Sequence, residues 1–300
     1  MARAGGKAPV NQRKHEQFGQ NPCEVQFRSV SIKVANQLPF SVDINRKGRD
    51  WQMNNRKPML FIKFGQKEHL ESLQKGNLYL NNLDYFIQME KKNNKKGMGD
   101  KSEASLMLTN VSIKFFHHDT HELAFTFDSA KTSLRMDEVL TKPVFCIMWV
   151  AAEDFEVIKE DENEVEAVLS FDAEQQKEML SEFGDHALVI EAARFIEALE
   201  RTLDQMELCC ATGKIDYINY STNKNAHLPE LMNNDLSVYF KKDHSLSYQK
   251  EFRAVILNKD IEEPITINIG DMTSFSGILP SPHLLSGGFG VKINLKHESS

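Results

Sequence analysis

An amide and a carboxylate stand two residues apart late in the chain. Residues 248–253 read Tyr-Gln-Lys-Glu-Phe-Arg, and the side chains of Gln249 and Glu251 share one face if this segment begins a β-strand. A fixed carboxylate beside a ribose stabilises the positive charge that develops as a glycosidic bond breaks, and a neighbouring amide can orient the incoming nucleophile. The pattern therefore indicates chemistry at the N-glycosidic bond of a nucleotide. The structural alternative is an ion pair between Glu251 and Arg253 on the surface of the same strand.

Hydrophobic periodicity predicts the elements that would position these residues. Residues 59–64 are predicted as a strand, 66–74 as a helix that ends before Gly76, 77–81 as a second strand and 83–89 as a short helix. Further strands are expected at 26–34, 40–44, 104–116, 122–128, 144–150, 187–190, 208–220 with a break at Gly213, 252–257, 265–269 and 291–295. Helices are expected at 172–183, with Asp172 near the N-cap, at 192–203, with Phe195, Ile196, Leu199 and Leu203 on one apolar face, and within 227–239. A loop is expected at 91–100, a solvated loop or helix edge at 153–166 and a loop from 278. Many strands with few, scattered helices indicate an α+β domain.

Two stretches of the chain carry a resemblance. The first reads Phe61-Ile62-Lys63-Phe64-Gly65-Gln66 and continues through Asn81-Asn82 to Tyr85-Phe86; the second is the segment at 248–253. Together they resemble a large, poorly characterised prokaryotic family of the ADP-ribosyltransferase-like superfamily, which has a Tyr-His-Tyr-Thr-Ser strand end, a later Ser-Ser-Pro with an aromatic pair, and a late Tyr-Glu-x-Glu-Trp-Arg. Lys63 stands at the His position, Asn81 and Asn82 at the two Ser positions, Gln249 at the first Glu and Phe252 at the Trp.

The resemblance implies a fold, an activity and a set of partners. The fold would be an ADP-ribosyltransferase-like split β-sheet with peripheral helices, over residues 58–300. The activity would be NAD-dependent mono-ADP-ribosyl transfer, in a toxin–antitoxin or phage-defence setting, with NAD as substrate, a nucleic acid or protein as acceptor and an antitoxin as a possible partner. Members with Gln-x-Glu more often modify acceptors other than arginine, including asparagine and guanine bases.

The resemblance also implies roles for individual residues, which we expect to line one cleft. Glu251 and Gln249 would be catalytic. The NAD-binding positions would be Lys63, Phe64, Asn81, Asn82, Tyr85 and Phe86, with Lys63 directed at the pyrophosphate and an aromatic ring on the nicotinamide. Structural alternatives exist, because Lys63 could be a solvated strand residue and the two aromatic residues could fill the core. An alternative class of function follows, a module that has lost catalysis and binds a nucleotide, RNA or protein.

Other candidate groups favour structural interpretations. The run His117-His118-Asp119-Thr120-His121 contains metal-binding side chains, but it falls between two predicted strands, and a solvated hairpin turn is the preferred interpretation. Cys209 and Cys210 are adjacent, so that they face opposite ways on a strand, and they are expected to be buried. We expect no metal.

Charge is distributed unevenly along the 300 residues. Residues 1–57 carry eleven Lys/Arg and four Asp/Glu, a net of +7, which leaves −14 for the remainder of a chain whose total is −7. A basic arm at 1–57 could hold an anionic partner or dock on the acidic body, or it could be a solvated tail. The run 91–97, Lys-Lys-Asn-Asn-Lys-Lys-Gly, is a candidate local basic site.

Composition excludes several classes. Hydrophobic residues make up 41% and charged residues 26%, as in globular proteins, which excludes collagen-like and wholly disordered chains. The longest apolar run has ten residues (143–152), short of a membrane span, and the N-terminus has no apolar core typical of a secretory signal. Four cysteines without CxxC spacing indicate reduced thiols, and the expected location is cytoplasmic.

Overall fold

The computed structural model describes residues 24–27, 30–33, 57–93, 97, 99–221 and 235–294. Within the basic segment, β1 (Glu24–Phe27) and β2 (Val30–Lys33) pair antiparallel, two strands where one was predicted. The strand predicted at 40–44 lies outside the described residues, as does most of the region in which a helix was predicted at 227–239.

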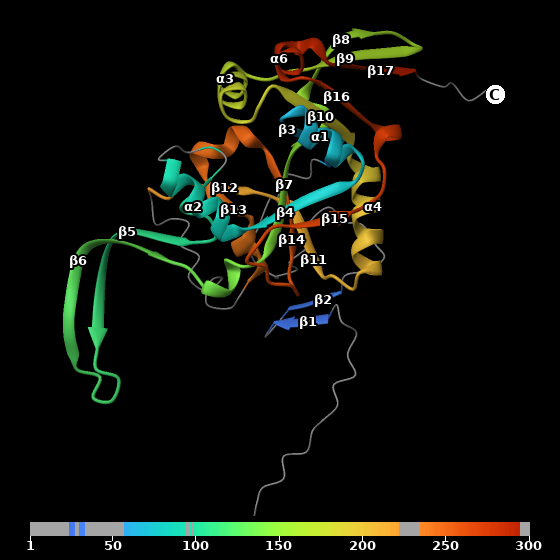
Figure 1. Cartoon of the computed structure of the whole chain (residues 1–300). Helices are drawn as coiled ribbons and strands as arrows, with labels where there is room; N and C mark the ends of the chain where they lie inside the picture. The colour runs from blue at the N-terminus through green and yellow to red at the C-terminus, as the bar shows by residue number, and fades with distance from the viewer. Residues whose placement is uncertain are drawn as a thin grey trace, which may run out of the picture.

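A sheet of eight antiparallel strands forms the centre of the molecule (Figure 1). Six strands lie in the order β11 (Cys210–Lys214), β14 (Glu251–Ile256), β7 (Pro143–Val150), β3 (Leu60–Gly65), β10 (His186–Glu191) and β16 (Ser276–Pro280). Two further strands, β4 (Asn77–Asn82) and β15 (Ile265–Asn268), join this sheet through β7. The α+β prediction is therefore confirmed.

The sheet forks at β7. The end of β7 pairs with β3, with Met148 opposite Ile62, whereas its start pairs with β4, with Val144 opposite Asn81. The connection between the two arms of the fork is α1 (Lys67–Gln74), which follows β3 and precedes β4. The middle of β7 thus has a strand partner on its β14 side but diverging strands on the other.

Alternation along the strands sends apolar side chains to both faces of the sheet. On one face, α4 (Ala192–Gln205) packs Phe195 against Phe61 with ring centroids 5.4 Å apart, and its predicted apolar face is buried. On the other face, Ile62 and Met148 belong to a cluster that includes Met179 of α3 (Ala173–Glu182). Asp172 begins α3 with a capping box to Gln175, as predicted for an N-cap.

Smaller elements surround the sheet. They comprise α2 (Leu83–Asn93); the hairpin of β5 (Leu106–Phe116) and β6 (Leu123–Leu134); the three-stranded sheet of β8 (Phe155–Glu160), β9 (Glu164–Leu169) and β17 (Gly290–Asn294); the parallel pair β12 (Asp216–Ile218) and β13 (Lys241–Asp243); the short turns η1 (Asp137–Val139), η2 (Ala152–Asp154), η4 (Leu236–Phe240), η5 (His244–Gln249) and η6 (Thr273–Phe275); and the consecutive α6 (Ser281–His283) and η7 (Leu284–Gly288). None of the helices in the described part of the chain is long and apolar enough to cross a membrane.

Several local predictions were wrong. The acidic stretch 153–166 forms most of the β8–β9 hairpin, because Lys159 and Lys292 supply cross-strand partners to Glu164. The segment expected to start a loop at 278 lies within β16, which pairs with β10. The strand at 208–220 breaks at Ile215 between β11 and β12, and Gly213 stays in β11 against the ring of Phe240. The helix predicted at 83–89 continues to Asn93 and so takes in the start of the expected loop.

We expect Gly76→Ala to lower the free energy of unfolding by more than about 2 kcal/mol. Gly76 ends α1 with φ +93°, a conformation that favours glycine, and a Cβ there would lie 2.2 Å from the carbonyl oxygen of Gly270. Gly277→Ala is the matched control, since a Cβ on Gly277 meets no atom within 4 Å. Urea denaturation of both variants provides the measurement, and equal stabilities would contradict this account of the turn.

Candidate functional site at the fork of the sheet

Lys63 lies at the fork. Its ammonium donates to the main-chain carbonyl of Cys146 at 2.6 Å and stands 5.1 Å from the centroid of the Phe145 ring. That carbonyl belongs to the stretch of β7 where β3 and β4 diverge, so the side chain satisfies a group that a strand would otherwise pair. Burial lowers the pKa of Lys63, an effect that the nearby charge of Glu251 opposes. The alternative of a solvated strand residue is wrong.

Glu251 begins β14, opposite Met148 on β7. Its Oε2 accepts from the ammonium of Lys242 at 2.7 Å, and its Oε1 accepts from Nε and Nη2 of Arg253 at 2.9 and 2.7 Å. The side chain is only 5% exposed. The ion pair with Arg253 therefore exists, but it lies in the interior and not on the surface, and it includes a second cation.

Arg253 joins a second carboxylate to this group. Its Nη1 lies 2.7 Å from Oε1 of Glu103 and donates to the carbonyl of Tyr239 at 2.5 Å. Glu103 and Arg253 are each about 1% exposed. We call Glu103, Lys242, Glu251 and Arg253 the buried charge cluster; it contains two acidic and two basic side chains.

The electrostatics of the cluster favour an ionised Glu251. Burial alone would raise the pKa of this carboxyl, but the charges of Arg253 and Lys242 outweigh it and hold the pKa well below its usual range. Burial likewise acts to lower the pKa of Lys242, and Glu251 and Glu103 raise it above its usual value. The Cys146 thiol lies against Glu251, and burial raises its pKa to about 12, so it is not a ready nucleophile.

Gln249 and Glu251 both contact the ammonium of Lys242. The side-chain oxygen of Gln249 accepts from the Lys242 ammonium at 3.1 Å, the same ammonium that pairs with Glu251. The strand expected to carry both residues is only partly present, because Gln249 ends the turn η5 and Lys250 adopts a left-handed conformation with φ 42°. The two side chains therefore contact the same ammonium although they do not lie on one regular strand.

A polar segment covers the cluster from the α2 side. The amide of Gln249 donates to the carbonyl of Gly97 at 2.7 Å, and Asp100 accepts from the main-chain nitrogen of Asp243 at 3.3 Å. Gly99 approaches the backbone of α2 so closely that a Cβ would lie 2.5 Å from the Phe86 carbonyl. We call the described residues Gly97 and 99–103 the cover; it supplies Glu103 to the cluster. Of the run proposed as a basic site, Lys91 and Lys92 lie exposed at the end of α2.

Asn82, Asn81 and Phe64 differ in how the fold uses their side chains. Asn82 donates to the carbonyl of Ile261 at 2.9 Å and accepts from the nitrogen of Tyr85 at 2.9 Å, which fixes the start of α2. Asn81 is 4% exposed, and its side-chain nitrogen has no hydrogen-bond partner among the described residues. Phe64 lies in the core, so the prediction that it contacts NAD is not supported by its position.

The two aromatic residues after Asn82 differ in their surroundings. Tyr85 is 46% exposed, and its ring meets that of Phe86 edge to face at 5.4 Å. Phe86 packs against the apolar cluster that contains Leu83. The core alternative is therefore wrong for Tyr85 and holds for Phe86.

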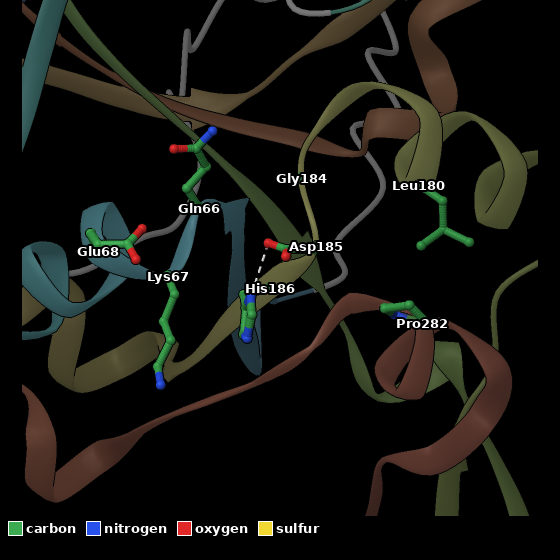
Figure 2. A pocket seen from close by; sticks show the side chains of 8 residues that line it. All are labelled: Gln66, Lys67, Glu68, Leu180, Gly184, Asp185, His186 and Pro282. Carbon is green, nitrogen blue, oxygen red and sulfur yellow. Dashed lines mark hydrogen bonds and ion pairs between the residues drawn. The ribbon is translucent and has the colours of Figure 1, made fainter.

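A hollow of about 670 Å³ lies elsewhere, at the far end of β3 (Figure 2). It is lined by Gln66, Lys67, Glu68, Leu180, Gly184, Asp185, His186 and Pro282. A side-chain contact of 2.9 Å joins His186 to Asp185, and the pKa of Asp185 is lowered by it. None of Lys63, Asn81 and Glu251 lines this hollow, so the structure brings them around β7 but does not place them in this opening.

The histidine run forms the predicted hairpin turn, whereas the paired cysteines agree with their prediction only in part, because Cys209 precedes β11 and Cys210 is partly exposed. Residues 117–121 form an exposed hairpin turn, closed by a hydrogen bond of 2.9 Å from the nitrogen of His117 to the carbonyl of Glu122. Within the described residues, no three His, Cys, Asp or Glu side chains are placed to hold a metal ion. Cys209 is buried, and burial raises the pKa of Cys210 to about 12.

Sequence reasoning missed Lys242, Glu103 and Asp100. Lys242 follows the apolar turn Leu236–Phe240, and its burial could have been suspected from a basic pair directly after an apolar run. Glu103 and Asp100 lie in a polar run without periodicity before β5, which carries no such signal. Their place in the site follows only from the fold.

Comparison of the chain with family models, with curated proteins and with solved structures finds no match. The resemblance therefore rests on the residues of the two stretches alone.

We expect Lys242→Met to lower the free energy of unfolding by about 3–5 kcal/mol, because it leaves the buried Glu251 short of a cation. The double variant with Glu251→Gln should be less destabilised than the sum of the two single variants, since both change one interaction. Urea denaturation measures all three, with exposed Lys177→Met as a control expected to be neutral. If the two single changes in the free energy of unfolding add up to that of the double variant, Lys242 and Glu251 are not directly coupled.

The cluster also predicts a pH dependence of stability. A carboxyl in the unfolded chain has a pKa near 4.5, whereas that of folded Glu251 is lowered by its two cations. As the pH falls, the unfolded chain is therefore protonated at this residue before the folded chain is. The contribution of Glu251 to the stability of the fold is present above about pH 5 and is lost as the pH falls through and below 4.5. The stability difference between the native chain and Glu251→Gln should shrink from about pH 6 to about pH 3, and a constant difference would exclude this assignment.

Proposed function

We propose that the chain is an NAD-dependent mono-ADP-ribosyltransferase whose catalytic carboxylate is Glu251. The observation that carries the proposal is the convergence of Gln249 and Glu251 on the Lys242 ammonium, beside the fork that holds Lys63. Buried charges are unfavourable for stability unless fully paired, and clusters of this kind are more frequent at functional sites. The resemblance assigns three of these positions, Lys63, Gln249 and Glu251, to the reaction.

The chemistry requires an anion at a fixed place. As the bond between the ribose C1′ and nicotinamide breaks, nicotinamide leaves with the bonding electron pair and the ribose becomes positively charged. A carboxylate held ionised by Arg253 and Lys242 needs no reorganisation to stabilise that charge. An acceptor oriented by Gln249 then forms the new bond to C1′ and releases its proton to solvent.

Access to Glu251 requires the cover to move. Glu251 is 5% exposed, and Gly97 and Glu103 contact Gln249 and Arg253 directly. NAD would therefore take the place of the cover, and its diphosphate would meet the cations that the cover now helps to neutralise. In this scheme Lys63 exchanges the Cys146 carbonyl for the substrate.

Incubation of the full chain with NAD labelled on the adenylate phosphate, in the presence of cell lysate, tests the proposal. We expect label on a protein or nucleic acid, and at least about 100-fold less with Glu251→Gln, equivalent to about 2.7 kcal/mol of transition-state stabilisation. Because Glu103 and Glu251 both pair with the buried Arg253, Glu103→Gln should also destabilise the fold but retain most of the transfer. Equal loss in both variants would assign Glu251 a structural role.

A specific observation favours a second candidate, a module that binds a nucleotide, RNA or protein without catalysis. Both oxygens of Glu251 are engaged by buried cations, and the Lys63 ammonium is engaged by a main-chain carbonyl. In that case the charged groups of Glu251 and Lys63 serve the fold. Binding of NAD or RNA without label transfer or release of nicotinamide would support this second function and overturn the first.

A further inference from the structure

The β5–β6 hairpin extends from the body of the molecule as an arm (Figure 1). In the described residues its two strands pair only with each other, over Leu106–Leu134 at the base and Phe116–Leu123 near the tip. A two-stranded hairpin is only marginally stable in water unless one face packs against something else. The arm is therefore expected to pack one of its faces against another surface.

One face of the arm is apolar and open. The register places Phe115 opposite Phe125 and Ile113 opposite Phe127, and side chains at these alternate positions share a face. The rings of Phe115, Phe125 and Phe127 form a cluster with centroids 4.5 to 5.9 Å apart, yet these side chains are 41%, 51% and 56% exposed. This pattern is typical of a strand pair with one buried face.

The opposite face has a different character. It carries Lys114 opposite Thr126, and Ser112 donates to Asp128 at 2.8 Å. The turn at 117–121 is polar and exposed, which argues against insertion of the tip into a lipid bilayer. The cluster of three rings therefore lies on one side of the arm, whereas Phe116, the next residue after Phe115, is exposed near the tip.

The exposed area suits a weak contact with a like surface. With about 200 Å² for a whole phenylalanine side chain, the three rings expose about 300 Å². Two such faces together would bury about 600 Å², which is in the range of weak, concentration-dependent protein–protein contacts.

We propose that this face docks on the same face of a second copy of the chain, in a two-fold symmetric dimer of arms. The rings and Ile113 carry no charge, so the surface is complementary to itself, as a symmetric interface requires. The chain has a net charge of −7, and contact through projecting arms joins two copies without pressing the acidic bodies together. Two stacked hairpins also supply the second layer that a lone hairpin lacks.

Sedimentation of the full chain from about 1 to 200 μM tests the dimer. We expect a concentration-dependent dimer that Phe127→Lys dissociates, with at least about a 100-fold higher dissociation constant. Thr126→Lys is the matched control, because it adds the same charge to the neighbouring residue on the opposite face, and it should leave dimerisation unchanged. Circular dichroism should show both variants folded, since these residues lie outside the core clusters.

Hydrogen exchange gives a second measurement that does not depend on a variant. The amides of 113–115 and 125–127 should gain protection as the concentration rises through the dimer range. A monomer at every concentration, or a dimer equally weakened by both lysine variants, would overturn the proposal. A wild-type monomer that captures a different protein through the arm would overturn it as well.

Discussion

The pairing of Arg253 with two buried carboxylates is the interaction on which the arrangement of the site depends. A guanidinium that is 1% exposed is tolerated only if its donors are satisfied, and Glu251, Glu103 and the Tyr239 carbonyl satisfy them. These partners come from β14, from the cover and from the turn before β13. The three segments must therefore assemble together, although some 150 positions separate Glu103 from Arg253 in the chain.

The fork explains why a basic residue stands on a core strand. Where β3 and β4 diverge, β7 exposes a main-chain carbonyl that no strand can reach, and Lys63 is long enough to donate to it. An ordinary apolar residue at this position would leave the carbonyl unpaired in the interior, which is unfavourable. The same geometry places the Lys63 ammonium near Glu251, so one side chain both completes the hydrogen bonding of β7 and adds a positive charge beside the charge cluster.

Local patterns predicted the elements well where one principle dominated. The amphipathic face of α4, the Asp172 cap of α3 and the left-handed Gly76 follow from periodicity and cap chemistry, and the structure has all three. The acidic hairpin at β8–β9 was missed because the partners of its carboxylates include Lys292, far away in the chain.

The candidate site likewise depends on contacts between residues that are distant in the sequence. Gln249 and Glu251 were found from their spacing, but Lys242 and Glu103 acquire their roles from the fold, and a charged residue in a polar stretch gives no sign that it will be buried.

The arm and the site are parts of one continuous structure. The cover leads directly into β5, and at the end of β6 Arg135 donates to the carbonyls of Glu103 and Lys101, each at 2.8 Å. Both ends of the hairpin are thus fastened to the segment that supplies Glu103 to the charge cluster. A displacement at the base of the arm must either break these hydrogen bonds or carry the cover with it. The segment that closes the cluster is therefore also the segment to which the base of the arm is fastened.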